Sequence, residues 1–419
     1  MRAEIITVGD ELLIGQVVNT NAAYVGEQLS FAGVDVATVT AVGDHEEAIE
    51  RALRDAWNRS DAIIVTGGLG PTHDDITKKV LCKFFNAGLV LHEPTVESIR
   101  GLLTSRNLAW SERAQEQAMV PQGATVIPNR YGTAPGLMFE RQGKVLVAMA
   151  GVPYEMKGII DSFVVPYFHE HPSGVSILHR TFNTTGITES LLSEKLGNID
   201  EMVGVSNEER RTTLAFLPSP QGVRIRITVR ARNLKNAQTR VEEIESRIRA
   251  RAGSYIFGCD EEILEEVVGR LLKERGLTIA VAESCTGGLI ADRITNVPGS
   301  SDYFESGVVV YSNSSKVELL RVAQELIDRN GAVSREVAEA MATGVRKRAC
   351  TDLGLSTTGI AGPTGGKAEK PVGLVWIGYA DEQETLALRF HLGNDRRRVK
   401  ERAAQAALDL VRRKLLKMP

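Results

Sequence analysis

The chain has 419 residues, of which 43% are hydrophobic and 25% charged, and its formal net charge at pH 7 is -3. This length predicts two or three domains, and the small net charge favours neither nucleic acid nor a membrane as partner. Four scattered cysteines without C-x-x-C spacing disfavour a disulfide framework or a zinc site. With neither a signal peptide nor an apolar run of the ~20 residues that a membrane span needs, we expect a cytoplasmic protein.

Residues 1–168 alternate strand-like and helix-like patterns, which is typical of a doubly wound α/β sheet. The expected strands are 4–8, 36–42, 62–66 and 145–149, with helices such as 46–57 and 76–86 between them. Glycine-rich turns follow several of these strands. In parallel sheets ligands bind beyond the carboxyl ends of the strands, so these turns are where we expect a site.

Residues 172–252 predict a small α+β module with a shape shared with KH-like folds. Its expected strands are 175–183, 213–217 and 223–229, and its expected helices are 189–196 and 233–252. No suitably placed GXXG loop, the RNA clamp of KH domains, accompanies them. We therefore favour a spacer or a dimerisation module. A linker is expected at 253–260, followed by a second α/β domain with three layers at 261–419.

The most informative stretch lies at the start of this last domain. An apolar run, 279–282, predicts a buried strand that stops at Glu283-Ser284-Cys285-Thr286-Gly287-Gly288, and a helical pattern follows. A hydroxyl and a thiol thus lie where a strand turns toward a helix N-terminus, which is a good position for a nucleophile. The N–H groups of Thr286 and Gly287 are expected to stabilise an oxyanion.

Three further motifs follow, each at a strand end: Val308–Lys316, Ser356–Gly366 and Gly393–Arg398. A serine needs a base, and the motifs offer Lys316, whose pKa burial could lower, with Tyr311 to relay the proton or hold the hydroxyl. The alternatives stay open at this point. In one alternative, Ser284 serves merely as a helix cap. Cys285 could be a small buried hydrophobe or itself the nucleophile, and Lys316 could be solvated.

In the N-terminal domain the strongest motif is Thr66–Asp75, where a strand enters a glycine-rich loop that includes Gly68 and Gly70. Such a loop can hold an anion on its backbone N–H groups. Asp74 and Asp75 add hard oxygen ligands for a divalent cation, although both could instead cap a helix. Three other segments, 9–13, 129–136 and 151–156, are expected to join this loop.

The four C-terminal motifs occur in the order and spacing of the CinA C-terminal domain, which resembles nicotinamide-nucleotide amidohydrolases. This resemblance implies hydrolysis of nicotinamide mononucleotide to nicotinic acid mononucleotide and ammonia, without a cofactor. It implies Ser284 as nucleophile, Lys316 as base and Tyr311 as its partner. The residues implied in substrate binding are Thr286, Gly287, Thr358, Gly359, Gly362 and Arg396. Arg396 would pair with the phosphate, although neighbouring arginines leave open which one does so.

The N-terminal segments resemble the molybdopterin-binding fold of CinA N-terminal domains, of the MogA and MoeA type. This resemblance implies metal-assisted hydrolysis of ADP-ribose, with Mg, Mn or Co as the metal. The residues implied at the phosphates are Asp10, Glu11, Asn19, Gly68, Gly70, Asp74, Asp75, Lys78 and Glu155, with Asp74 and Asp75 on the metal. The alternative is a catalytically silent module that binds a pterin or a nucleotide.

The whole chain is expected to be a bifunctional homodimer that recycles pyridine nucleotides. A DNA-associated role, which the family's name suggests, is disfavoured by the net charge and by the absence of a basic stripe interleaved with aromatic residues.

Overall fold

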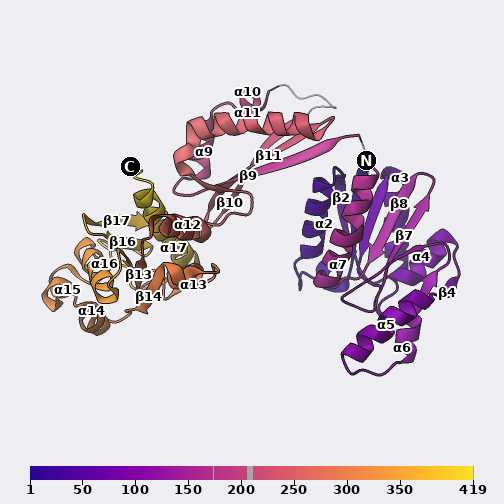
Figure 1. Cartoon of the computed structure of the whole chain (residues 1–419), viewed down its shortest axis with the longest axis horizontal. Helices are drawn as coiled ribbons and strands as arrows, with labels where there is room; N and C mark the ends of the chain where they lie inside the picture. Colours follow the sequence, from indigo (N-terminus) through magenta and orange to yellow (C-terminus); the bar gives the residue numbers. More distant parts are fainter. Residues whose placement is uncertain (173, 205–210, 419) are drawn as a thin grey trace. The chain divides into compact units, whose positions relative to one another are not determined.

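The computed structural model describes residues 1–172, 174–204 and 211–418, which form two compact units (Figure 1). The first unit consists mainly of residues 1–179, and the second includes everything from residue 241 onward. No helix in the described part of the chain is long and apolar enough to cross a membrane.

The N-terminal sheet has the strand order β2-β1-β3-β8-β7-β6. Its strands are β1 (Arg2–Val8), β2 (Asp35–Val42), β3 (Ala62–Thr66), β6 (Thr125–Ile127), β7 (Gly136–Arg141) and β8 (Lys144–Met149). The strands β2, β1, β3 and β8 run parallel, whereas β7 and β6 pair in antiparallel fashion at one edge. The predicted doubly wound sheet is thus confirmed, with an antiparallel edge added to it.

Helices cover both faces of this sheet because its central strands are apolar on both sides. Ala3 and Ile5 of β1 pack on α2 (Thr20–Phe31) and α7 (Pro153–Ile159), whereas Ile6 and Val8 belong to the core under α3 (Glu46–Arg59) and α4 (Thr77–Phe85). The remaining elements of the domain are α1 (Asp10–Leu13), β4 (Leu89–Leu91), α5 (Glu93–Ser105), α6 (Glu112–Ala118), β5 (Met119–Pro121), η1 (Ile160–Val164) and α8 (Val165–Glu170).

The middle module is a four-stranded sheet of order β10-β11-β9-β12 with a long helix. Its elements are β9 (Ser176–Thr184), α9 (Glu189–Leu196), α10 (Ile199–Val203), β10 (Arg211–Ser219), β11 (Gly222–Ala231), α11 (Leu234–Ala252), η2 (Gly253–Tyr255) and β12 (Ile256–Cys259). Buried and exposed side chains alternate along β11, as the sequence predicts.

The expected linker at 253–260 needs correction. Residues Ile256–Cys259 form β12, which pairs antiparallel with β9, so that Ile256 lies opposite Thr184 and Cys259 opposite Phe182. The segment that connects the module to the C-terminal domain therefore includes a strand of the module's sheet. Only a few residues then separate β12 from α12 (Leu264–Arg275).

The C-terminal sheet has the order β14-β13-β15-β16-β17. Its strands are β13 (Ile279–Glu283), β14 (Phe304–Val309), β15 (Leu353–Gly359), β16 (Leu374–Ala380) and β17 (Thr385–His391), and β14, β13 and β15 run parallel. The helices are α12, α13 (Leu289–Thr295) and α17 (Arg396–Leu415) on one face, and α14 (Asn313–Leu320), α15 (Gln324–Asn330) and α16 (Arg335–Ala349) on the other, with η3 (Ser300–Asp302) as a short turn.

The central strand β13 explains these three layers. Its side chains Ile279 and Val281 enter the core under α12, α13 and α17, whereas Ala280 and Ala282 enter the core under α14, α15 and α16. The predicted three-layer α/β domain is therefore confirmed.

Candidate functional site

The C-terminal site lies where the parallel strands β13, β14 and β15 reach their carboxyl ends. Ser284 follows β13 directly, and its backbone N–H donates to the carbonyl of Thr357 on β15 at 3.0 Å. On the other side, the N–H of Val310 donates to the carbonyl of Glu283 at 2.8 Å. The two neighbouring strands thus hold the serine in place through main-chain bonds, at the sheet edge where ligands of α/β proteins bind.

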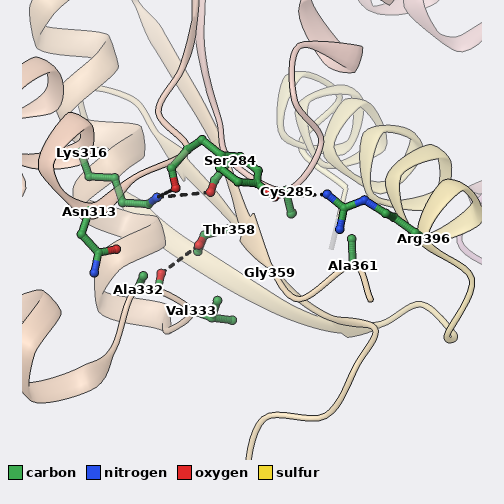
Figure 2. A pocket seen from close by; sticks show the side chains of 11 residues that line it. Ser284, Cys285, Asn313, Lys316, Ala332, Val333, Thr358, Gly359, Ala361 and Arg396 are labelled. Carbon is green, nitrogen blue, oxygen red and sulfur yellow. Dashed lines mark hydrogen bonds between the residues drawn. The ribbon is translucent and has the colours of Figure 1, made fainter. Parts of the chain in front are cut away.

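Lys316 reaches Ser284 from α14. Ser312 caps this helix by accepting a hydrogen bond from the N–H of Ser315 at 3.1 Å, and Lys316 follows one turn into the helix. Its side chain is 1% exposed, and its Nζ lies within hydrogen-bond distance of Ser284 Oγ, at 3.2 Å (Figure 2). The predicted pair of nucleophile and base is therefore in contact.

The surroundings of the amine suit a base. Burial lowers the pKa of Lys316 below its ordinary value, which favours the neutral amine. Three carbonyl oxygens surround its Nζ, those of Val310 at 2.8 Å, Tyr311 at 3.2 Å and Ser312 at 3.4 Å, and the first two are the nearest acceptors. A neutral amine has two N–H donors and one lone pair. With both donors given to carbonyls, the lone pair is left for the hydroxyl proton of Ser284.

Cys285 lines the same cavity but has the wrong protonation state for a nucleophile at neutral pH. Burial raises the pKa of its thiol to about 12, so the thiolate is scarce. The structure thus favours the serine over the cysteine.

The helix N-terminus after Ser284 differs from expectation. α13 begins only at Leu289, and the carboxylate of Glu283 accepts hydrogen bonds from the N–H groups of Gly288 at 2.9 Å, Ile290 at 3.1 Å and Ala291 at 2.9 Å. These donors and the positive end of the helix dipole are therefore already compensated.

The turn before α13 keeps its own donors. Within the part of the chain that the structure describes, no group accepts a hydrogen bond from the N–H groups of Thr286 or Gly287. The N–H groups of this turn are thus sufficient to supply the expected oxyanion donors, without those of α13. The side chain of Thr286 is fully buried and bonds the hydroxyl of Thr357 at 2.7 Å, so Thr286 could contribute to substrate binding only through its backbone.

A cavity of about 170 Å³ opens beside Ser284 and Lys316. It is lined by Ser284, Cys285, Tyr311, Asn313, Lys316, Ala332, Val333, Thr358, Gly359, Ala361 and Arg396, most of which Figure 2 labels. Thr358 donates its hydroxyl hydrogen to the carbonyl of Ala332 at 2.8 Å, which fixes one wall. Of the predicted substrate-binding residues, Thr358, Gly359 and Arg396 lie in this lining.

Arg396 and Tyr311 contact each other at the mouth of the cavity. The guanidinium donates to the Tyr311 hydroxyl at 3.1 Å and to the carbonyl of Gly362 at 2.8 Å. Gly362 thus positions the arginine from outside the lining. Tyr311 is 63% exposed, and its backbone carbonyl, not its hydroxyl, accepts from Lys316. The structure therefore pairs the Tyr311 hydroxyl with Arg396, whereas a proton relay to Lys316 stays a prediction.

Three of the four predicted N-terminal segments follow the carboxyl ends of the parallel strands β1, β3 and β8, and the fourth, 129–136, lies between β6 and β7. A Cβ built on Gly151 would lie 3.2 Å from Gly67 Cα, so the segment 151–156 borders the glycine-rich loop. Glu155 accepts a hydrogen bond from Asn129 Nδ2 at 2.6 Å, which joins the segment 129–136. The predicted grouping of segments is present.

Asp10 and Glu11 begin α1 and are exposed, and they have a neighbour that the sequence did not single out. The N–H of Asp10 donates to Asp44 Oδ2 at 3.0 Å, and the N–H of Asp44 donates to Asp10 Oδ1 at 3.2 Å. Burial raises the pKa of Asp44, and repulsion from the carboxylates of Asp10, Glu11 and Asp74 adds to this rise. Negative charge thus gathers at this end of the sheet.

The other predicted N-terminal residues mostly hold the fold together. Asn19 caps α2 and donates to Thr7 Oγ1 at 3.0 Å, and Lys78 donates to the carbonyls of Glu116 and Met119, both at 3.1 Å. Asp75 accepts a bond from the N–H of Thr72 at 2.9 Å within its own loop. The two loop glycines, Gly68 and Gly70, leave space for the side chains of Thr77 and Asp75. A Cβ on Gly68 would collide with Thr77, and a Cβ on Gly70 would collide with Asp75.

The carboxylates do not form a metal cage by themselves. Among the described residues, no group of at least three His, Cys, Asp or Glu side chains is arranged to hold a metal ion. A divalent cation at Asp74 and Asp75 would need further oxygens from water or from substrate phosphates, which is the usual manner for magnesium.

The fold and the C-terminal site define a three-part α/β protein with a serine–lysine pocket. Its parts match three family models: "Probable molybdopterin binding domain" over residues 4–170, "Damage-inducible protein CinA KH domain" over 179–258 and "CinA C-terminal domain" over 261–415. The chain belongs to the CinA family, which confirms the resemblance found in the sequence.

Relatives match the chain from end to end. A CinA-like protein of Kosmotoga olearia is 44% identical over 416 residues and covers 99% of both chains. A CinA-like protein of Salinibacter ruber is 45% identical over 416 residues, with 99% of this chain and 100% of the relative covered. Among solved structures, the competence/damage inducible protein CihA from Agrobacterium tumefaciens is 37% identical, with 36% of this chain and 95% of that chain covered and a TM-score of 0.35.

Sequence reasoning missed two residues that the structure places at these sites. Asn313 lines the C-terminal cavity, and Asp44 joins the N-terminal carboxylates. Both had a usable signal, because each is a polar residue just beyond the carboxyl end of a strand. The role of Glu283 as a helix cap had no such signal, because it depends on how the next turn folds.

Proposed function

We propose that the C-terminal domain hydrolyses nicotinamide mononucleotide to nicotinic acid mononucleotide and ammonia. The observation that carries this proposal is the contact of 3.2 Å between Lys316 Nζ and Ser284 Oγ, made by a lysine whose pKa burial has lowered. A neutral amine beside a serine hydroxyl is what a Ser–Lys hydrolase requires. The family resemblance supports the choice of an amide of a nucleotide as substrate.

In the proposed reaction, Ser284 Oγ attacks the carboxamide carbon while its proton passes to Lys316 Nζ. The oxyanion that forms is stabilised by the N–H groups of the turn Cys285–Gly287. Lys316 returns the proton to the amide nitrogen, the C–N bond breaks, and ammonia leaves. Water then attacks the ester on Ser284, with Lys316 taking and returning one proton, and nicotinic acid mononucleotide is released.

Ammonia release from nicotinamide mononucleotide tests this proposal. The wild-type protein should release ammonia and Ser284→Ala should release none, since no hydroxyl is left to form the ester. Calorimetric titration should show that Ser284→Ala still binds the substrate. If the wild type releases no ammonia, the amidase proposal fails. Substantial turnover by Ser284→Ala would instead shift the nucleophile to Cys285.

For the N-terminal domain we propose hydrolysis of ADP-ribose to AMP and ribose 5-phosphate with Mg, Mn or Co. The observation in favour is the gathering of Asp10, Glu11 and Asp74 around Asp44, whose pKa is raised by burial and by their charge. Such a set of carboxylates attracts a divalent cation, which would offset their repulsion and bind phosphates. The metal would supply electrostatic activation of the phosphoanhydride.

A chelator separates the two proposed activities. It should stop ADP-ribose cleavage and spare ammonia release, because only the N-terminal proposal includes a metal. If ADP-ribose cleavage survives chelation, the metal role of Asp74 and Asp75 is refuted. If no cleavage occurs with any of the three metals, the silent binding module is the better account. A cytoplasmic homodimer that recycles pyridine nucleotides completes the proposal, and sedimentation of the full chain tests the dimer.

A further inference from the structure

A second cation lies beside the turn that follows Ser284. Asp395 caps α17 by accepting a hydrogen bond from the N–H of Arg398 at 2.8 Å, and the helix begins at Arg396. Lys400 follows Arg396 by four residues, so both side chains project from the same side of the helix. Arg396 belongs to the lining of the cavity, which places Lys400 one turn further along its rim.

Gly287 shows where the Lys400 amine lies. A Cβ built on this glycine would be 3.5 Å from Lys400 Nζ. Gly287 is exposed and has a φ of 63°, which other residues adopt at a cost. The glycine thus allows the turn its shape and leaves no side chain between the amine and the free N–H groups of the turn.

Among the described residues, neither Arg396 nor Lys400 has an acidic partner. Across the described residues, no carboxylate lies within ion-pair distance of Arg396 or Lys400, whereas the adjacent Arg397 pairs with Glu401 at 3.2 Å. Two uncompensated cations and a turn with free N–H groups make an electropositive rim next to the nucleophile.

We infer that Lys400 is a specificity-determining residue that binds the phosphate of the substrate, together with Arg396. The inference rests on the proposed amidase function and predicts that a nucleotide is preferred to the corresponding nucleoside. The distance is suitable, because Gly287 lies three positions after Ser284 and such a stretch spans at most about 11 Å. One nucleotide can therefore reach the serine with its amide and the rim with its phosphate.

The test compares two substrates that differ only in the phosphate, nicotinamide mononucleotide and nicotinamide riboside. Lys400→Gln should lower kcat/KM for the mononucleotide by about tenfold through KM, because a charge-assisted hydrogen bond is lost, and should leave the riboside unchanged. Lys400→Arg should restore most of the activity. Arg397→Gln is the matched control, since it removes a neighbouring cation that is paired with Glu401, and it should change neither substrate.

Two outcomes would overturn the inference. Equal losses on both substrates would mean that Lys400 supports the fold or the chemistry, and an unchanged KM for the mononucleotide would mean that it does not contact the phosphate. If the wild type releases ammonia from neither substrate, the amidase proposal fails instead. In that case calorimetric titration tests whether Lys400 binds the phosphate. If it does, the wild type should bind the mononucleotide about tenfold more tightly than Lys400→Gln does.

Discussion

Replacing Lys316 with methionine is the sharpest perturbation of the proposed mechanism. The side chain is 1% exposed, and an unbranched methionine can follow much of the same buried path. Without the amine, no base among the described residues remains in contact with Ser284. General-base catalysis contributes about 10²–10⁴-fold, so ammonia release should fall by that factor.

The effect on folding should be small and should depend on pH. The variant leaves the carbonyls of Val310 and Tyr311 without their partner, which costs about 1–3 kcal/mol for buried acceptors. It also removes the penalty of burying an amine, which offsets part of that cost. This penalty is greatest at low pH, where the buried amine has to carry a charge.

The direction follows from the lowered pKa of Lys316 in the folded protein. Between that pKa and the value of about 10.4 for an exposed lysine, the unfolded chain binds more protons, so the stability of the wild type rises with pH. Methionine carries no titratable group and so contributes no such increase in stability with pH. The loss of stability in Lys316→Met should therefore grow as the pH rises through this window.

Two measurements check the prediction. Ammonia release by the wild type should increase with pH as Lys316 loses its proton, and urea unfolding at several pH values should show the growing loss of stability in the variant. Lys347→Met, which removes an exposed lysine of α16, is the matched control and should behave like the wild type. Lys316→Met with more than about a tenth of the wild-type rate would refute the role of Lys316 as base.

Three further changes test the surroundings of the pair. Cys285→Ala should keep most of the ammonia release, because burial raises the pKa of this thiol to about 12; an inactive but folded variant would make Cys285 the nucleophile. Tyr311→Phe should raise KM for nicotinamide mononucleotide about three- to tenfold with kcat unchanged, since the lost hydroxyl bonds Arg396; a fall in kcat alone would support the proton relay instead. Glu283→Gln should cost about 1.5–3 kcal/mol in urea unfolding, because the charged cap of α13 is lost; an unchanged midpoint would contradict that role.

The strands and the C-terminal pair were predictable because they depend on local patterns. Apolar runs such as 62–66 and 279–282 mark buried strands, and Ser284 directly follows the second of these. Lys316 lies seven residues after β14, whose side chains alternate between partly buried and exposed. The parallel order of the sheet then brings the strand ends together. The contact between the two side chains required only that neighbouring parallel strands share an edge.

The features that were missed depend on long-range pairing. β12 is a short strand that contains a glycine and a cysteine, and only its pairing with β9 distinguishes it from a linker. Likewise, the start of α13 at Leu289 follows from the cap that Glu283 provides, and the Tyr311 hydroxyl turns to Arg396 because α17, far along the chain, brings the guanidinium there. Local sequence patterns carry none of this information.

The two sites differ in how much of their chemistry is already assembled. In the C-terminal pocket, Ser284 and Lys316 touch in a buried place, and both amine donors have partners, so a substrate has only to supply the carbonyl. In the N-terminal site the carboxylates of Asp10 and Asp74 are exposed, and each of them repels the carboxylate of Asp44, a repulsion that the proposed cation would offset. Preorganised groups lose little entropy on reaction, whereas a site completed by its ligand depends on the concentration of that ligand. Activity of the C-terminal domain should therefore be insensitive to added metal, while any activity of the N-terminal domain should rise with metal concentration until the site is saturated.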